Sequence, residues 1–314
     1  MELYKKIIDG DIEALSKGIT LLESTLEIDK KRAENLLLIA RKQNNKSIRI
    51  GITGVPGVGK STFIENFGQH WINKNKKVAV LAIDPTSNSN KGSILGDKSR
   101  MHNLASQKNA FIRPSPTSGT LGGVAEKTFD SISLCEAAGY DIILVETVGV
   151  GQNEFLVEKL VDIVILLMLP NAGDELQAIK RGIMEYADII AVNKCDEENK
   201  IQAMKSMMLY NDSSVFIQSK NYWTKKVVVC SALENTGISE ILNLVIDYNN
   251  IIKSKETNKI LRKDQKLFWF HKKIKEELGL RNYRLLVNDN KIQKIEERYL
   301  KSGITLDEIL SDFC

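Results

Sequence analysis

"GVPGVGKST", from Gly54 to Thr62, sets the expectation for the whole chain. It fits the pattern G-x-x-x-x-G-K-S and stands between the apolar run IRIGIT and a segment with helical spacing. This context predicts a P-loop, in which backbone amides and a helix N-terminus surround a phosphate. Lys60 would place its charge between the terminal phosphates, and the Ser61 hydroxyl would bind Mg²⁺. The predicted phosphate-binding residues are Gly54, Val55, Pro56, Gly57, Val58, Gly59, Lys60, Ser61 and Thr62.

Short apolar runs recur on both sides of this loop, between residues 47 and 250. Runs so continuous are typical of strands that are buried on both faces. Segments with helical spacing separate most of them and cover 60–74, 124–138, 175–186 and 237–252. The alternation predicts an α/β fold of the P-loop NTPase kind, a mostly parallel sheet flanked by helices, with ligands at the carboxyl ends of the strands. The runs are IRIGIT, VAVLAID, AFIRP, DIILVET, DIVILLML, DIIAVNK and VVVCSA.

The two ends of the chain have a different pattern. Residues 12–25 and 29–43 show helical spacing, which predicts a helical N-terminal segment over 1–45 before the P-loop domain of 46–254. Residues 255–314 are lysine-rich and then amphipathic, with a second stretch that resembles two short helices broken at Gly303. A helical stripe without an obvious core of its own predicts an arm that packs on another surface. The stripe consists of Leu267, Phe268, Phe270, Ile274 and Leu278, with Trp269 beside it.

The composition of the 314-residue chain excludes several classes of protein. The net charge of +4, from 44 basic and 40 acidic side chains, is too balanced to indicate a nucleic-acid-binding protein. The four cysteines have no C-x-x-C spacing and the three histidines lie far apart, so neither a disulfide framework nor a transition-metal site is indicated. The N-terminus does not resemble a signal peptide, and the longest apolar run is too short to span a membrane. We expect a soluble cytoplasmic protein with reduced thiols.

"NKCD", from Asn193 to Asp196, follows the run DIIAV and predicts a guanine site. The Asp196 carboxylate can accept from the ring N–H and the exocyclic amine of guanine together. Adenine offers no such pair of donors, so a site of this kind discriminates strongly. Asn193 can reach the other edge of the base, while the Lys194 stem would lie along the ring. The segment CSAL follows the next predicted strand and would supply backbone groups of Ser231, Ala232 and Leu233 to the same base.

Acidic residues also follow the predicted strands and indicate a Mg²⁺ site. Glu146 in VETVG ends one strand and would hold a water of the metal, while the Gly149 amide would meet the γ-phosphate. Asp84 ends the second predicted strand, and Asp97 and Arg100 lie in a glycine- and serine-rich loop that suggests a switch. Asp84, Asp97 and Arg100 could instead cap loops or lie on the surface.

The residue after Gly149 is Val150, where many small GTPases place the glutamine that orients the attacking water. A valine cannot do this, so we expect a slow intrinsic turnover or a group supplied from elsewhere. Gln152 and Gln177 are the nearby candidates for that group.

The motifs taken together resemble the MeaB/ArgK family of P-loop GTPases over residues 45–250. The resemblance implies a dimerising GTPase that binds GTP, GDP and Mg²⁺. It also implies a chaperone that gates cofactor loading of an adenosylcobalamin-dependent acyl-CoA mutase, chiefly methylmalonyl-CoA mutase, and protects it. An older family name ties its members to the transport of basic amino acids as a kinase. The segments that carry the resemblance are GVPGVGKST, AIDPTS, GSILGDKSRM, RPSPTSGTLGG, VETVGVGQNE, PNAGDELQAIKRGI and VNKCD.

The resemblance also implies particular residue roles. Lys60 and Ser61 match the phosphate and Mg²⁺ ligands of the family, and Asp84, Asp97 and Glu146 match its acidic metal-site positions. The stretch from Asn171 to Arg181 resembles a third switch loop that reports the nucleotide state to the mutase. Its polar positions are Asp174, Gln177 and Lys180.

Three other functions stay open on the sequence. A nickel-delivery GTPase of the same class would need cysteine or histidine ligands near the switches, and those of this chain are scattered. An ATP-dependent kinase of a transport protein is opposed by NKCD, which selects guanine. A nucleotide-controlled binding module without hydrolysis is compatible with Val150 but less so with Lys60, Ser61 and Glu146.

Overall fold

The computed structural model describes residues 2–42, 46–83, 101–114, 121–147, 154–170, 182–214, 220, 222–288 and 291–302. The chain divides into two compact units. The sheet unit consists of Ser47–Thr128 and Tyr140–Glu256, and the helical unit of Met1–Lys46, Phe129–Gly139 and Thr257–Cys314.

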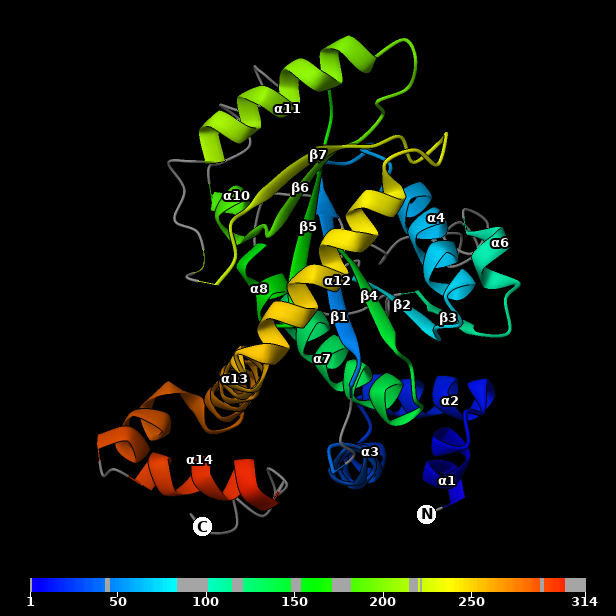
Figure 1. Cartoon of the computed structure of the whole chain (residues 1–314). Coiled ribbons are helices and arrows are strands. Elements are labelled where there is room, and N and C mark those ends of the chain that lie inside the picture. Colours follow the sequence, from blue (N-terminus) through cyan, green and yellow to red (C-terminus); the bar gives the residue numbers. More distant parts are fainter. Residues whose placement is uncertain are drawn as a thin grey trace. The chain divides into compact units, whose positions relative to one another are not determined.

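The sheet unit is built on parallel strands, seven of them in the described part of the chain (Figure 1). Their order is β3-β2-β4-β1-β5-β6-β7, so the strand before the P-loop is central. Every predicted strand is found, and the α/β P-loop fold is confirmed. The strands are β1 (Ile48–Gly54), β2 (Val78–Ile83), β3 (Ala110–Arg113), β4 (Ile142–Thr147), β5 (Ile163–Met168), β6 (Ile189–Val192) and β7 (Lys226–Val229).

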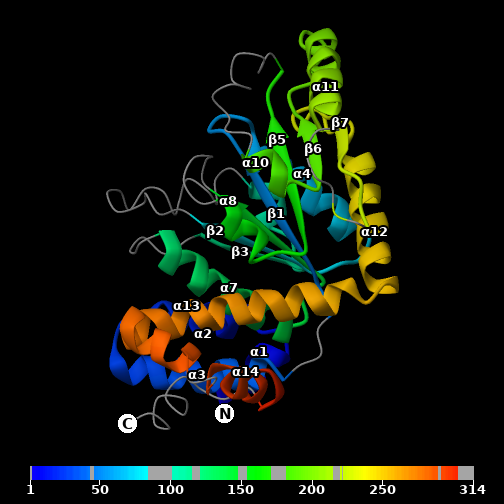
Figure 2. The same cartoon turned by 90° about the vertical axis from the view of Figure 1, so that its left-hand side faces the viewer.

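Helices cover both faces of this sheet, as Figure 2 shows from a second side. Ile48, Ile50 and Ile52 alternate along β1 and pack with α4 and α12 in one apolar core. On the opposite face, Gly51 lies against α8, and α10 and α11 pack on β5 and β6. The helices of this unit are α4 (Lys60–Asn73), α6 (His102–Ala105), α8 (Glu154–Glu158), α10 (Gly182–Tyr186), α11 (Lys200–Ser214) and α12 (Ile238–Ser254). Helix α7 (Leu121–Ala137) contributes residues to both units.

The strand register brings the motifs to one edge of the sheet. Ile52 of β1 pairs with Glu146 of β4, so the P-loop begins beside this acid. Val192 of β6 pairs with Val229 of β7, and the two base motifs therefore leave the sheet as neighbours. Parallel strands place their carboxyl ends together, which is why residues far apart in the sequence meet here.

The helical unit joins both ends of the chain in one body, whereas the sequence predicted two separate flanking segments. Its helices are α1 (Glu2–Ile8), α2 (Ile12–Glu23), α3 (Glu27–Ala40), α13 (Thr257–Asn288) and α14 (Lys291–Ser302), and α13 is interrupted at Gly279. Arg41, directly after α3, contacts residues of α7 and α14. It forms an ion pair of 2.7 Å with Asp130 and donates to the Tyr299 hydroxyl at 3.1 Å. The predicted break at Gly303 lies outside the described residues.

The expectation that the apolar stripe of the arm has no core to join in its own chain is wrong. Trp269 stacks on Phe129 with ring centroids 5.8 Å apart. Phe270 and Ile274 are buried in a cluster with residues of the last helix. Leu267, Phe268 and Leu278 remain half-buried. The periodicity identified the buried face, but it carries no information on which surface covers that face.

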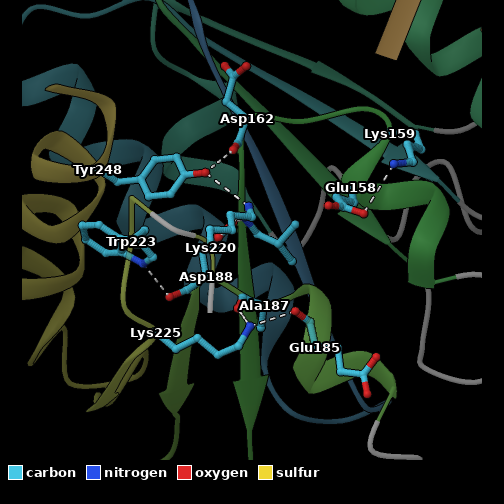
Figure 3. A network of polar contacts seen from close by, with 11 residues as sticks. Glu158, Lys159, Asp162, Glu185, Ala187, Asp188, Lys220, Trp223, Lys225 and Tyr248 are labelled. Atoms are coloured by element: carbon cyan, nitrogen blue, oxygen red, sulfur yellow. Dashed lines mark hydrogen bonds and ion pairs between the residues drawn. The ribbon is translucent and has the colours of Figure 1, made fainter. Parts of the chain in front are cut away.

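A network of buried polar groups lies at the amino ends of β5, β6 and β7 (Figure 3). Lys220 forms an ion pair of 2.7 Å with Asp188, whose other oxygen accepts from the Val164 N–H at 2.9 Å. Lys225 donates to the carbonyls of Glu185 at 2.8 Å and Ala187 at 2.7 Å, at the end of α10. These bonds satisfy backbone groups that burial would otherwise leave without partners.

Among the described residues, no helix is both long and apolar enough to cross a bilayer.

Candidate functional site

The P-loop curls between β1 and α4 because two of its glycines adopt conformations that other residues disfavour. Gly54 has a φ of 151°, and a Cβ there would lie 2.5 Å from the Leu167 carbonyl oxygen. Gly59 has a φ of 95°, and a Cβ there would lie 2.8 Å from Nδ2 of Asn193. Only glycine fits such positive φ values with so close an approach. The backbone can therefore turn sharply at the start of α4, where amide groups bind anions.

The Lys60 side chain folds back onto the start of the P-loop. Its Nζ donates to the carbonyls of Gly54 at 3.0 Å and Val55 at 3.2 Å. Burial lowers the pKa of Lys60 below its usual range, and the charge of Glu146 opposes this shift. A buried ammonium held by carbonyl dipoles lacks a full counter-charge, so a bound phosphate would stabilise it.

The structure brings together Ser61 and Glu146, for which the sequence predicts a role at the metal. The Ser61 hydroxyl donates to Oε1 of Glu146 at 3.1 Å, and Glu146 is 9% exposed. A hydroxyl and a carboxylate at this spacing are the hard oxygen donors that Mg²⁺ prefers. The residues present therefore fit a Mg²⁺-nucleotide, in which Ser61 and Glu146 would hold the metal and the loop would hold the phosphates.

Asn193 joins the P-loop to the base motifs. Its Nδ2 donates to the Val58 carbonyl at 2.8 Å, and its Oδ1 accepts from the Ala232 N–H at 2.9 Å. The side chain is 1% exposed. Asn193 thus connects the NKCD segment to the P-loop and to the CSAL segment. The sequence did not predict this role. Its contact with the base edge stays a prediction.

Asp196 is oriented by Ser231 from the neighbouring strand end. The Ser231 hydroxyl donates to Oδ1 of Asp196, and Ser231 Oγ accepts from the Glu234 N–H at 3.0 Å. Lys194 adopts a φ of 61° and is exposed, so the turn places it outside the buried contacts of Asn193. The arrangement fixes the carboxylate that we expect to recognise guanine.

The CSAL segment is held by a residue that the sequence did not suggest. Asn66 of α4 donates to the Ala232 carbonyl at 2.6 Å, while the Ala232 N–H is used by Asn193. Within the described residues, the Leu233 N–H has no acceptor, and its side chain is 78% exposed. Leu233 is therefore the backbone donor of this segment that remains open to a base. An asparagine in a helix carries no spacing signal that could have revealed this contact.

Several predicted site residues lie outside the described residues. They are Asp84, Asp97, Arg100, Gly149, Val150, Gln152, Asp174, Gln177 and Lys180. Thr62 is described and is exposed on the first turn of α4. The structure thus describes the residues predicted to bind phosphate, metal and base at 54–62, Glu146, 193–196 and 230–233.

This fold and these contacts define the class of the protein. A P-loop after the central strand, with an N-K-x-D motif clamped to it from β6, is the arrangement of a P-loop GTPase. The comparisons with known proteins then give the family. The model of the family described as "Methylmalonyl Co-A mutase-associated GTPase MeaB" matches residues 15–284.

Relatives with known names agree with this match. A probable GTPase of Mycobacterium tuberculosis is 46% identical over 261 residues, covering 83% of this chain and 78% of the relative. GTPase ArgK of Escherichia coli is 41% identical over 279 residues, covering 88% and 84%. The mitochondrial methylmalonic aciduria type A homolog of mouse is 40% identical over 287 residues, covering 88% and 69%.

A solved structure shows the same fold over nearly the whole length. The crystal structure titled LAO/AO transport system kinase has a TM-score of 0.76 and 32% identity, covering 99% of this chain and 96% of that one. The chain belongs to the MeaB family of mutase-associated GTPases. The predicted resemblance is confirmed.

Proposed function

We propose that this protein is a GTP-hydrolysing chaperone that gates cofactor loading of an adenosylcobalamin-dependent acyl-CoA mutase of the methylmalonyl-CoA type and protects that mutase. The observation that carries the proposal is the family match over residues 15–284. The bond of 3.1 Å between Ser61 and Glu146 supports the hydrolytic part, because it brings two oxygen donors of the kind that Mg²⁺ prefers together next to the P-loop. The reduced cysteines Cys135, Cys195 and Cys230 are compatible with a cytoplasmic protein.

The residues of the chain divide the work of binding and hydrolysis. Lys60 and the P-loop amides hold the phosphates and stabilise the charge of the transferring group. Ser61 and Glu146 hold Mg²⁺, with Asp84 and Asp97 proposed to complete its surroundings. When bound, Mg²⁺ neutralises charge on the phosphate oxygens. Asp196 selects guanine, and Leu233 offers a backbone N–H to the base.

Communication with the mutase is assigned to residues 171–181 through Asp174, Gln177 and Lys180. A loop that changes place with the nucleotide gives the partner different affinities for the GTP and GDP states. By reciprocity the mutase then changes nucleotide affinity, and we expect it to accelerate hydrolysis as a separate kinetic effect. A slow intrinsic rate is consistent with Val150 after Gly149.

The working unit is proposed to be a homodimer. Leu280 and Leu285 in the last turns of α13 are 54% and 56% exposed, and Val287 is 40% exposed. Exposed apolar side chains are candidates for protein contacts. Since the apolar stripe of the arm is largely covered within its own chain, we propose these three residues as the dimer contact instead.

The test mixes the purified chain with the methylmalonyl-CoA mutase of the same genome. Size-exclusion chromatography in GTP and in GDP should show a complex whose stability depends on the nucleotide. Hydrolysis should rise when the mutase is added. Alanine at Asp174, Gln177 and Lys180 together should leave GTP affinity intact and remove the acceleration. Absence of any complex or acceleration with the unaltered chain would reject the mutase as the partner.

A further inference from the structure

Glu65 lies one helical turn after Ser61 on α4, the helix that begins in the P-loop. Its Oε1 accepts from the Asn103 N–H at 2.8 Å and from the Leu104 N–H at 3.2 Å. These are among the first amides of α6, whose own N-cap residue Met101 makes no side-chain cap. Amides at a helix start need an acceptor, and Glu65 supplies it from another element.

Helix α6 lies beside α4 (Figure 1), and apolar packing also holds it there. Leu104 is fully buried, and a Cβ at Gly68 of α4 would lie 2.6 Å from Leu104 Cδ2. Met101 is 1% exposed. Residues 101–105 are therefore anchored on the P-loop helix.

The side chain of Glu65 is not one that stability alone would favour. It is 9% exposed, and within the described residues its Oε2 is buried without a hydrogen-bond partner. Burying a charged group with an unsatisfied oxygen costs stability. A group that is kept at such a cost suggests a role in the reaction.

We propose that Glu65 is a positioning residue for GTP hydrolysis. Through the two bonds to α6 it fixes Asn103 and Leu104, which follow Asp97 and Arg100 in the sequence, relative to its own helix α4. The inference rests on the proposed roles of Asp97 and Arg100. Nucleotide binding by the P-loop and by Asp196 does not pass through this contact. Glu65 therefore affects the reaction step and not the affinity for GDP.

The experiment compares Glu65→Ala and Glu65→Gln in the full chain. A glutamine oxygen can still accept from both amides, whereas alanine removes the acceptor. The matched control is Asp141→Ala, because Asp141 also accepts a backbone amide, that of Lys77 at 2.9 Å, and does not touch α6. Each variant is measured for kcat and KM of GTP hydrolysis, GDP affinity and melting temperature.

We expect Glu65→Ala to lower kcat on the order of 10- to 100-fold, since small misplacements of catalytic groups cost this much. GDP affinity should stay within about twofold, which separates a loss in the reaction step from a loss in binding. Glu65→Gln should keep most of kcat, and Asp141→Ala should keep all of it.

Three results would overturn the inference. They are an unchanged kcat in Glu65→Ala, a parallel loss of kcat and GDP affinity, or a glutamine variant as slow as the alanine variant. If Glu65→Ala does not fold, the test rests on Glu65→Gln, which still accepts from both α6 amides. A kcat of one tenth of wild type or less in that variant would then overturn the inference. No mutase is present in this test. A chain that hydrolyses GTP but ignores the mutase would reject the proposed partner and leave the inference on Glu65 standing.

Discussion

The hydroxyl of Ser61 donates to Glu146 across 85 residues of sequence, at 3.1 Å. One residue belongs to the helix after the central strand and the other to the end of β4. Their contact follows from the pairing of Ile52 with Glu146. The bond lies where we propose that Mg²⁺ binds beside the phosphates.

Glu146→Gln should lower the apparent affinity for Mg²⁺ in GTP hydrolysis. It should also slow hydrolysis by about 100-fold, as when one transition-state stabilising group is lost. Ser61→Ala should act in the same direction. Because the two side chains share one site, the double variant should lose less than the sum of the single losses. Hydrolysis rates over a Mg²⁺ titration, with EDTA as the zero point, measure this. A glutamine variant with the Mg²⁺ dependence of the wild type would contradict the metal role.

Asp196→Asn should weaken GTP binding by on the order of 100-fold or more, because a polar site rejects a base that leaves its groups unpaired. The same variant should favour xanthosine triphosphate, whose ring carbonyl can accept from the new amide. Ser231→Ala should act more weakly in the same direction, since Asp196 then loses the donor that orients it. Competition of GTP, ATP and xanthosine triphosphate for a fluorescent nucleotide measures the three affinities. Equal affinity of the wild type for ATP and GTP would reject the guanine site.

The strands could be predicted from the sequence because each is a short apolar run with its motif at the carboxyl end. Helix α11 could not, since Ile201 and Met208 are exposed while Ala203 and Tyr210 are buried. Apolar residues on opposite sides of a helix cancel the periodic signal. The contact of Trp269 with Phe129 also could not be predicted, because helical periodicity shows which face of a helix is apolar but not which residues pack on that face.

The sequence suggested roles only for residues whose type suits a ligand directly, and those proposed for Lys60, Ser61 and Asp196 stay predictions. The site could not be predicted where a residue serves it through another segment. Asn66 and Glu65 are ordinary polar residues of a helix in the sequence. Their roles arise from contacts with Ala232 and with the start of α6.

Cys195 should be the cysteine that reports nucleotide binding, because it is partly exposed between Lys194 and Asp196. Burial raises the pKa of Cys230 to about 12, so that thiol stays protonated and unreactive at neutral pH. Cys135 is buried and its pKa is raised in the same way. Iodoacetamide labelling in a Cys314→Ser background, read by mass spectrometry, should modify Cys195 and be slowed by GDP but not by ADP. Labelling at the same rate with and without GDP would contradict this placement.

Leu285→Glu should convert the proposed dimer to a monomer, because a charge would replace an exposed apolar contact. Leu280→Glu should have the same effect. The control is Asn282→Glu, an exposed polar position on the same turns of α13. Light scattering on the full chain measures the mass. Deleting residues 256–314 would not be a clean test, since Trp269 and Ile274 are part of the core of the helical unit. A Leu285→Glu chain that stays dimeric would exclude this surface.

The ion pair between Asp188 and Lys220 should contribute more to stability than an exposed pair. The two side chains are 3% and 25% exposed, and the oxygen and nitrogen lie 2.7 Å apart (Figure 3). Asp188→Asn leaves the ammonium without its counter-charge and should cost about 3 kcal/mol, as when one partner of a buried pair is removed. The control is Lys76→Met, which removes a pair with Asp141 whose side chains are 45% and 39% exposed. That change should cost less than about 1 kcal/mol.

The contribution of this pair should also depend on pH in a defined direction. Burial acts to lower the pKa of Lys220, but the charge of Asp188 and the bond to it outweigh burial, and the pKa is raised above 10.5. A lysine whose pKa is raised by folding stabilises the protein fully below its unfolded value and loses this effect as pH rises through the folded value. The difference in unfolding free energy between wild type and Lys220→Met should therefore be constant at neutral pH and shrink above pH 10.5. Urea unfolding of both proteins at neutral and strongly alkaline pH measures it, and a difference that grows with pH would show that the ammonium is not the stabilising form.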